Sequence, residues 1–226
     1  MRYYPIFLDL TDRPCVVIGG GEVATRKVEG LLAAGARVTV ISPQVSSEIA
    51  RLRDEVRIAH VAREYQEGDL EGFEVCMVAT DDGTVNAQVA AEGRRRRVWV
   101  NASDDPANCD FILPSVIRRG DVVVAASTGG SSPALARRLR EELQAFLSED
   151  YAPLAELLRD VRRELRQRRI TVEPEVWQRA IDGTLRALLA QRRHGEAKDR
   201  LLAALGVGVS MFARPARRTA SRKDGA

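Results

Sequence analysis

Three small residues near the amino terminus have the spacing of a phosphate-binding turn. Gly19, Gly21 and Ala24 fit the pattern G-x-G-x-x-G/A, in which a strand passes through a tight turn into a helix. Gly19 permits the sharp turn, Gly21 lets the backbone approach a pyrophosphate, and Ala24 allows the helix to pack closely on the strand. The following helix adds free N–H groups and a partial positive charge. The pattern predicts nucleotide binding, and the alternative is a glycine turn without a ligand.

A second Gly-rich stretch, residues 127–133, precedes another predicted helix. Ser132 is suited to cap this helix and Pro133 to be its first residue. Free N–H groups at such a helix start can hold an anion, so the stretch is a second candidate anion site. A plain connection between a strand and a helix is the alternative.

Two neighbouring carboxylates follow the fifth predicted strand. Asp104 and Asp105 precede Pro106, and a loop at the carboxyl end of a parallel strand faces the ligand crevice. A carboxylate in this position could accept a proton. Asp-Asp-Pro is also a turn sequence, and from the residues alone the turn is the favoured interpretation.

The elements around these residues alternate between strand and helix. Apolar runs predict strands at 15–18, 37–41, 56–60, 75–79 and 98–101, with helices ending at Gly35 and covering 46–52 and 84–93. A further edge strand is expected at 6–10. This alternation predicts an α/β fold with a Rossmann-like, doubly wound parallel sheet. Thr80, after the fourth strand, then also faces the crevice.

The end of the second predicted strand departs from the usual dinucleotide pattern. An acidic residue commonly stands there and holds the ribose hydroxyls, whereas this chain has Ser42, Pro43 and Gln44. No arginine follows at once to hold a 2′-phosphate. We therefore expect NAD to be preferred over NADP.

The second half of the chain has a different pattern. Apolar runs at 111–117 and 121–126 predict a β-hairpin, and an apolar helical stripe follows at Leu135, Leu139, Leu143, Phe146 and Leu147. These elements are too apolar for a lone surface, which predicts a homodimer. Residues 151–205 read as helices, and 214–226 as a disordered basic tail. We expect domains at 1–112 (NAD-binding), 113–147 (dimerisation) and 148–212 (helical), followed by the tail at 213–226.

Composition excludes several classes of protein. No apolar run is long enough to cross a membrane and no signal peptide is evident, so a cytoplasmic protein is expected. Aromatic residues are only 5%, with no recognition helix, which argues against nucleic acid. His60, His194 and the three cysteines lack metal-ligand spacing, so no metal site is expected. The net charge of +3 suits a small anionic partner.

Four ordered segments together are more specific than the glycine pattern alone. They are Pro5–Leu10, Val17–Lys27, Ala79–Asp82, and Phe111–Ser115 with Ser127–Pro133. Through them the chain resembles the precorrin-2 dehydrogenase family, which occurs alone or as the N-terminal module of siroheme synthase. The resemblance covers about residues 3–210. It implies NAD-dependent oxidation of precorrin-2 to sirohydrochlorin by a homodimer whose central segment is shared between subunits.

The resemblance also assigns roles to particular residues. It places the catalytic aspartate at Asp104, with a one-residue error to Asp105 left open. Cofactor contacts carry over to Gly21, Glu22, Val23, Ser42, Pro43 and Gln44, beside Gly19 and Thr80 from the crevice argument. Because the implied substrate carries many carboxylates, the second candidate anion site is expected to bind some of them, through Ser127, Thr128, Gly129, Gly130, Ser131 and Arg137.

Two other functions remain open at this stage. Some members of the family also insert Fe²⁺ to give siroheme, and the sequence does not decide whether this chain does so. A non-catalytic NAD-sensing module would keep the glycine turn but need no aspartate in the crevice. The methyltransferase domain of fused siroheme synthases would follow the helical region, so that activity is not expected from these residues.

Overall fold

The computed structural model describes residues 3–103 and 105–208, which divide into two compact units. The first comprises the chain up to residue 114 together with 127–133, and the second comprises 115–126 and the chain from 134 onward. No helix in the described part of the chain is both long and apolar enough to span a membrane. The predicted tail at 213–226 lies outside the described residues.

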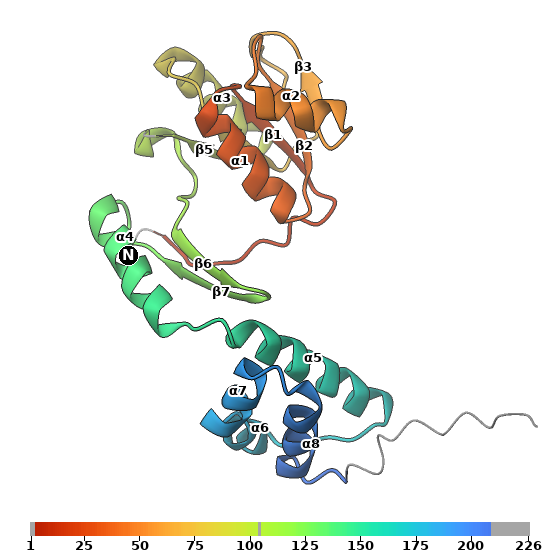
Figure 1. The fold of residues 1–226 in the computed structure, drawn as a ribbon. Coiled ribbons are helices and arrows are strands. Elements are labelled where there is room, and N and C mark those ends of the chain that lie inside the picture. Colours follow the sequence, from red (N-terminus) through yellow and green to blue (C-terminus); the bar gives the residue numbers. More distant parts are fainter. Residues whose placement is uncertain (1–2, 104, 209–226) are drawn as a thin grey trace, which may run out of the picture. The chain divides into compact units, whose positions relative to one another are not determined.

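The first unit is built on a five-stranded parallel sheet (Figure 1). Its strand order, β3-β2-β1-β4-β5, places β1 at the centre. The strands are β1 (Pro14–Ile18), β2 (Arg37–Ile41), β3 (Ala59–Val61), β4 (Val75–Val78) and β5 (Trp99–Ala102). The helices are α1 (Glu22–Ala33), α2 (Ser47–Asp54) and α3 (Gly83–Arg96), with a 3₁₀ turn at Pro106–Asn108. The predicted Rossmann-like doubly wound fold is confirmed.

The side chains of β1 point alternately to the two faces of the sheet, and both faces are buried. Cys15 and Val17 pack with α1 and α2, whereas Val16 and Ile18 pack with α3. All four side chains are buried, because helices cover both sides of the central strand. The continuous apolar run of β1 is what such a doubly covered strand requires.

Three local predictions differ from the structure. The strand expected at 6–10 is wrong, since those residues form no regular element and Phe7 is exposed. A strand needs neighbouring backbone groups to pair with, and an apolar run does not reveal whether they are available. The third strand begins at Ala59 rather than Val56, because Val56 adopts a left-handed turn after α2. The helix predicted to end at residue 93 continues to Arg96, so that Arg94 to Arg96 form the last turn of α3.

A buried carboxylate on α3 fixes the loop that follows β3. Glu92 is only 1% exposed and accepts hydrogen bonds from the Tyr65 hydroxyl at 2.5 Å and from the N–H groups of Gly68 and Leu70. Arg96 pairs with the same carboxylate at 2.7 Å. Burial raises the pKa of Glu92, but these hydrogen bonds outweigh burial and hold the pKa below its usual range.

The described residues of the second unit form a hairpin and five helices. The hairpin pairs β6 (Ser115–Arg119) with β7 (Val122–Ala126) in antiparallel register. The helices are α4 (Pro133–Phe146), α5 (Tyr151–Gln167), α6 (Pro174–Ala180), α7 (Gly183–Ala190) and α8 (His194–Ala204). Leucines of α5, α7 and α8 form its core, among them Leu165, Leu185 and Leu201. In contrast, α4 buries none of its residues.

Replacing Glu92 by glutamine should lower stability, because it weakens the hydrogen bonds of this carboxylate to the loop after β3 and removes its ion pair with Arg96. We expect Glu92→Gln to reduce the free energy of unfolding by about 1–3 kcal/mol at pH 7. Because the folded-state pKa is depressed, the stabilisation is present above the unfolded pKa of about 4.3 and is lost as pH falls through the folded pKa. Urea denaturation of both proteins at pH 7 and at decreasing pH measures this difference.

Glu71→Gln is the matched control for that experiment. Glu71 pairs with the same Arg96 at 3.3 Å, but its side chain is 78% exposed. Its loss should change stability by less than about 0.5 kcal/mol. An equal decrease in the free energy of unfolding in the two variants would contradict the role given to Glu92.

Candidate functional site

The glycine turn after β1 brings three backbone segments into contact. Gly19 has φ +112°, and a Cβ there would lie 2.3 Å from the Ala79 carbonyl oxygen. A Cβ on Gly20 would lie 2.0 Å from the Gln44 carbonyl oxygen. Both positions therefore require glycine for packing, and Gly19 requires it also for its positive φ.

Gly21 has a different environment from the other two glycines. It lies in ordinary extended backbone at the start of α1, and a Cβ there would meet nothing within 4 Å. Its glycine is thus not needed to fold the turn. Ala24, one turn later, is fully buried against the sheet, as its place in the pattern predicts. The open space at Gly21 lies at a helix amino terminus, where N–H groups and the helix dipole favour an anion.

A cleft of about 560 Å³ opens beside this turn, at the carboxyl edge of the sheet. It brings together the predicted residues Gly19, Gly21, Ser42, Pro43, Gln44 and Thr80. Glu22 and Val23 are exposed on the first turn of α1 and are not among its lining residues. The cleft also includes residues to which the sequence analysis gave no role in the site: Glu64, Tyr65, Asp82 and Val85.

The segment after β2 is fixed by its own hydrogen bonds. Ser42 is buried, and its hydroxyl donates to the Gln44 carbonyl at 2.6 Å. His60 Nε2 lies 2.9 Å from the Ser42 carbonyl oxygen and completes the contact with β3. Ser46 then caps α2 by accepting from Ile49 N–H, and its Oγ lies 2.8 Å from Thr25 Oγ1. The wall of the cleft is therefore pre-formed.

The opposite wall follows β4. Thr80 Oγ1 donates to Asn86 Oδ1 at 3.0 Å, which ties the loop to α3. Asp82 caps α3 by accepting from Thr84 and Val85 N–H groups. Capping satisfies N–H groups that have no partner within the helix, so this carboxylate has a structural role here.

Asp104, the predicted catalytic residue, lies outside the described residues. The rest of its loop is held against β5: Asp110 Oδ2 accepts from Val100 N–H at 2.9 Å, and Asn101 Nδ2 donates to the Phe111 carbonyl at 2.9 Å. Asp105 accepts from Asn108 Nδ2 at 2.7 Å. Burial raises the pKa of the Cys109 thiol, which donates to the Ala102 carbonyl at 3.0 Å.

Lys27 is a buried cation that sequence reasoning missed. It is 8% exposed, and its Nζ donates to the Val78 carbonyl at 3.1 Å and to Asn101 Oδ1 at 2.9 Å. It thereby joins α1 to the ends of β4 and β5, directly before the loop that contains Asp104. A signal was present, since Lys27 lies three residues after Ala24 and four before Leu31, on the buried side of α1.

The second Gly-rich loop is organised by Thr128. Its hydroxyl donates to the Ser132 carbonyl at 3.0 Å and accepts from Ser132 N–H at 3.1 Å. Gly129 and Gly130 both have positive φ, and a Cβ on either would meet nothing within 4 Å. Ser127 accepts from Gly129 N–H, Ser131 is exposed, and Arg137 is exposed on α4.

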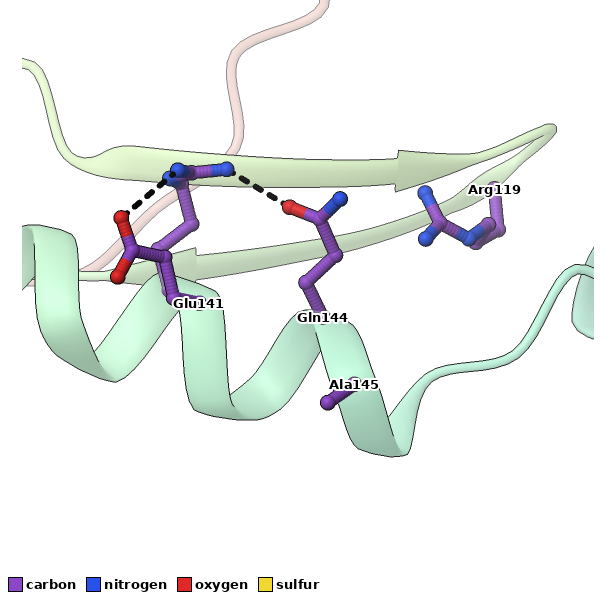
Figure 2. A pocket seen from close by; sticks show the side chains of 5 residues that line it. Arg119, Glu141, Gln144 and Ala145 are labelled. Atoms are coloured by element: carbon purple, nitrogen blue, oxygen red, sulfur yellow. Dashed lines mark hydrogen bonds and ion pairs between the residues drawn. The ribbon is translucent and has the colours of Figure 1, made fainter.

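A second hollow, of about 490 Å³, belongs to the second unit. Figure 2 shows it between the hairpin and α4, with Arg119, Glu141, Gln144 and Ala145 around it. Its cations are already engaged: Arg140 donates to Gln144 Oε1 at 2.7 Å, and Arg119 pairs with Glu149 at 3.1 Å. None of the predicted site residues lines it, so we place the candidate site in the first cleft.

Two family models match successive parts of this chain. Residues 6–115 match a family described as putative NAD(P)-binding, and residues 119–145 match the central part of sirohaem biosynthesis proteins. The first match covers the sheet and the cleft, and the second covers the end of the hairpin and most of α4. The first unit therefore has the fold of an NAD(P)-binding domain.

Similar proteins support the same assignment. The chain is 43% identical over 208 residues to a siroheme synthase of Methylococcus capsulatus, and 39% identical over 211 residues to one of Thioalkalivibrio sulfidiphilus. These alignments cover 90% and 92% of this chain but only 44% and 43% of the relatives. The chain thus spans less than half the length of these relatives. The solved structure of SirC, a precorrin-2 dehydrogenase, matches with a TM-score of 0.71 and 29% identity, covering 88% of this chain and all of that one.

The two kinds of glycine at the turn should respond differently to substitution. Gly19→Ala should destabilise the protein by about 1–3 kcal/mol, because alanine rarely adopts the positive φ and its Cβ meets Ala79. Gly21→Ala should change stability by less than about 1 kcal/mol. It should weaken NAD binding about tenfold or more, a loss of at least about 1.4 kcal/mol, because its Cβ fills the open space at the helix start. Thermal melting and calorimetric titration with NAD measure these effects, and normal NAD affinity in Gly21→Ala would contradict this assignment.

Proposed function

We propose that this chain, which belongs to the family of siroheme synthases and precorrin-2 dehydrogenases, catalyses the NAD-dependent oxidation of precorrin-2 to sirohydrochlorin. The observation that carries the proposal is the glycine-turn cleft at the carboxyl edge of a Rossmann-like sheet, in a chain whose structural neighbour is a precorrin-2 dehydrogenase. The siroheme synthase relatives point to the same tetrapyrrole chemistry.

The residues of the cleft fit a dinucleotide. Open space at Gly21, beside the free N–H groups of α1, fits a pyrophosphate, and Glu22 and Val23 would contribute their backbone there. Ser42, Pro43 and Gln44 would border the adenosine half, and Thr80 the opposite half. Bound NAD supplies the two-electron acceptor for the reaction.

Asp104 is proposed to accept the proton that the substrate loses. It lies three residues after Asn101, whose position is fixed by Lys27 and the Phe111 carbonyl. The end of β5, which precedes Asp104 in the sequence, is therefore fixed, and a general base requires such support to be positioned. The ionised carboxylate would hold the proton while the cleft holds the cofactor.

The loop at 127–131 and Arg137 are proposed to receive substrate carboxylates. Thr128 already shapes the loop, and Gly129 and Gly130 have open space where a Cβ would lie, so no side chain shields the backbone there. Backbone N–H groups of such a loop and a guanidinium are suitable donors to carboxylates.

The segment 113–147 is proposed to form a homodimer. In the sequence it follows a proposed NAD-binding domain at 1–112 and precedes a proposed helical domain at 148–212. Large apolar residues of α4 are exposed, including Leu135 at 50% and Phe146 at 78%. The segment contains residues 119–145, which match the central part of sirohaem biosynthesis proteins. A stripe of this kind is stabilised when a second copy covers it.

Insertion of Fe²⁺ into the product is the second candidate activity. The name of the relatives, siroheme synthase, favours it. Metal insertion needs a base that removes pyrrole protons, and Asp104 could serve there as well. The iron would be a substrate rather than a resident cofactor.

One anaerobic experiment separates these functions. Purified protein is incubated with precorrin-2 and NAD, and absorption spectra are recorded with and without added Fe²⁺ or Co²⁺. A sirohydrochlorin spectrum that requires NAD supports the dehydrogenase, and a further metal-dependent change supports metal insertion. NAD binding without any spectral change would overturn the proposal in favour of a sensing module.

Asp104→Asn should abolish most of the dehydrogenase activity. The amide keeps the shape but cannot accept the proton, so turnover should fall about 10²–10⁴-fold, or roughly 3–5 kcal/mol in the barrier. NAD affinity should barely change, because the phosphates are assigned to the start of α1. Steady-state rates and NAD titration measure the two effects. Asp105→Asn is the control and should be much milder; the reverse result would move the role to Asp105, and two active variants would exclude a catalytic carboxylate here.

Light scattering should find a dimer at micromolar concentration, twice the 24.9 kDa mass of the chain. Leu139→Glu should produce monomers, because a charge on the apolar stripe opposes its burial. Val56→Glu, at a residue that is also exposed but lies far from α4 in sequence, is the control and should remain dimeric. A monomeric wild-type protein would refute the proposed interface.

A further inference from the structure

The end of β2 lacks the acidic residue that usually binds the ribose of a dinucleotide. In the usual fingerprint, a carboxylate at this place accepts hydrogen bonds from ribose hydroxyls. Ser42 stands there, but it is buried and donates its hydroxyl hydrogen to the Gln44 carbonyl. Another group in the cleft must supply the acceptor if the ribose is to be held in this way.

Glu64 is suitably placed to supply that acceptor. It lines the cleft together with Ser42 and Gln44, and it comes from the loop after β3, the strand beside β2. The two loops are joined, since Ser42 N–H donates to the Val61 carbonyl at 3.2 Å. The loop that contains Glu64 is also rigid, because Tyr65 donates to buried Glu92.

The other carboxylate of the cleft and its phenol are already engaged. Asp82 caps α3, and the Tyr65 hydroxyl donates to Glu92. The Glu64 carboxylate, in contrast, makes no hydrogen bond or ion pair with another residue in the described part of the chain. Its acceptor oxygens are available to a ligand.

The side chains that line the same cleft carry no positive charge in the described part of the chain. None of the described residues that line it is a lysine or an arginine. Arg63, the neighbour of Glu64, is held by Asp69 through two hydrogen bonds of 2.7 and 2.6 Å. A 2′-phosphate would therefore meet a carboxylate and no available guanidinium there.

We propose that Glu64 is the specificity-determining residue that binds the adenosine ribose of NAD and excludes NADP. This inference rests on the proposed function for its cofactor but assigns a residue that the sequence pattern does not indicate. Glu64 replaces the acidic residue missing at Ser42, from the loop of the neighbouring strand. Its negative charge repels the 2′-phosphate, and its oxygens accept from the ribose hydroxyls.

Calorimetric titration of the full chain with NAD, NADP and 2′-deoxy-NAD tests this assignment. The wild-type protein should bind NAD at least about tenfold more tightly than either analogue, as expected for a lost hydrogen bond to a charged group. Glu64→Gln should weaken NAD binding about fivefold to tenfold and leave little discrimination against the two analogues. Glu64→Arg should favour NADP, because a guanidinium can pair with the phosphate.

Glu67→Gln is the matched control. It makes the same charge change in the same loop, but Glu67 pairs with Arg95 and does not line the cleft. Its affinities should equal those of the wild-type protein, and thermal melting of every variant checks folding. If Glu64→Gln keeps the wild-type preference, the inference fails while the cofactor site stands. If the wild-type protein binds neither dinucleotide, both the inference and the proposed function fail.

Discussion

The close approach of backbone to backbone at Gly19 and Gly20 is the constraint on which the first unit depends. Gly19 lies against the carbonyl of Ala79, after β4, and Gly20 lies against that of Gln44, after β2. The ends of three adjacent strands are thereby brought within contact distance. No side chain fits between them, so the space for a ligand is displaced to Gly21 and the surrounding loops. The same contact that closes the fold therefore defines the cleft.

Two buried charges extend this organisation away from the turn. Lys27 joins α1 to the ends of β4 and β5, and Glu92 joins α3 to the loop after β3. Burying a charge is costly unless several hydrogen bonds compensate, and both groups have them. Lys27 holds the end of β5 at Asn101, while Glu92 supports the loop that contains Glu64. Stability and the geometry of the site thus rest on the same side chains.

The second unit distributes its apolar residues differently. Its core is formed by α5, α7 and α8 with α6, whereas α4 leaves its leucines and Phe146 exposed. An amphipathic helix without a buried face is incomplete as a monomer surface. A second copy of this segment would complete it, and the match to the central part of sirohaem biosynthesis proteins covers most of this helix.

The sequence by itself determined the parallel α/β fold, the glycine turn and the helix starts at Ser46 and Pro133, because glycine spacing, apolar runs and capping residues act over a few neighbouring positions. It also led to the family. Only the tertiary structure decided the partners of Lys27, the burial of Glu92, the engaged hydroxyl of Ser42 and the place of Glu64 in the cleft. Those contacts join residues far apart in the chain, such as Lys27 and Asn101. The strand wrongly predicted at 6–10 has the same cause: whether a polar group is buried or a strand is paired depends on which distant segments pack beside it.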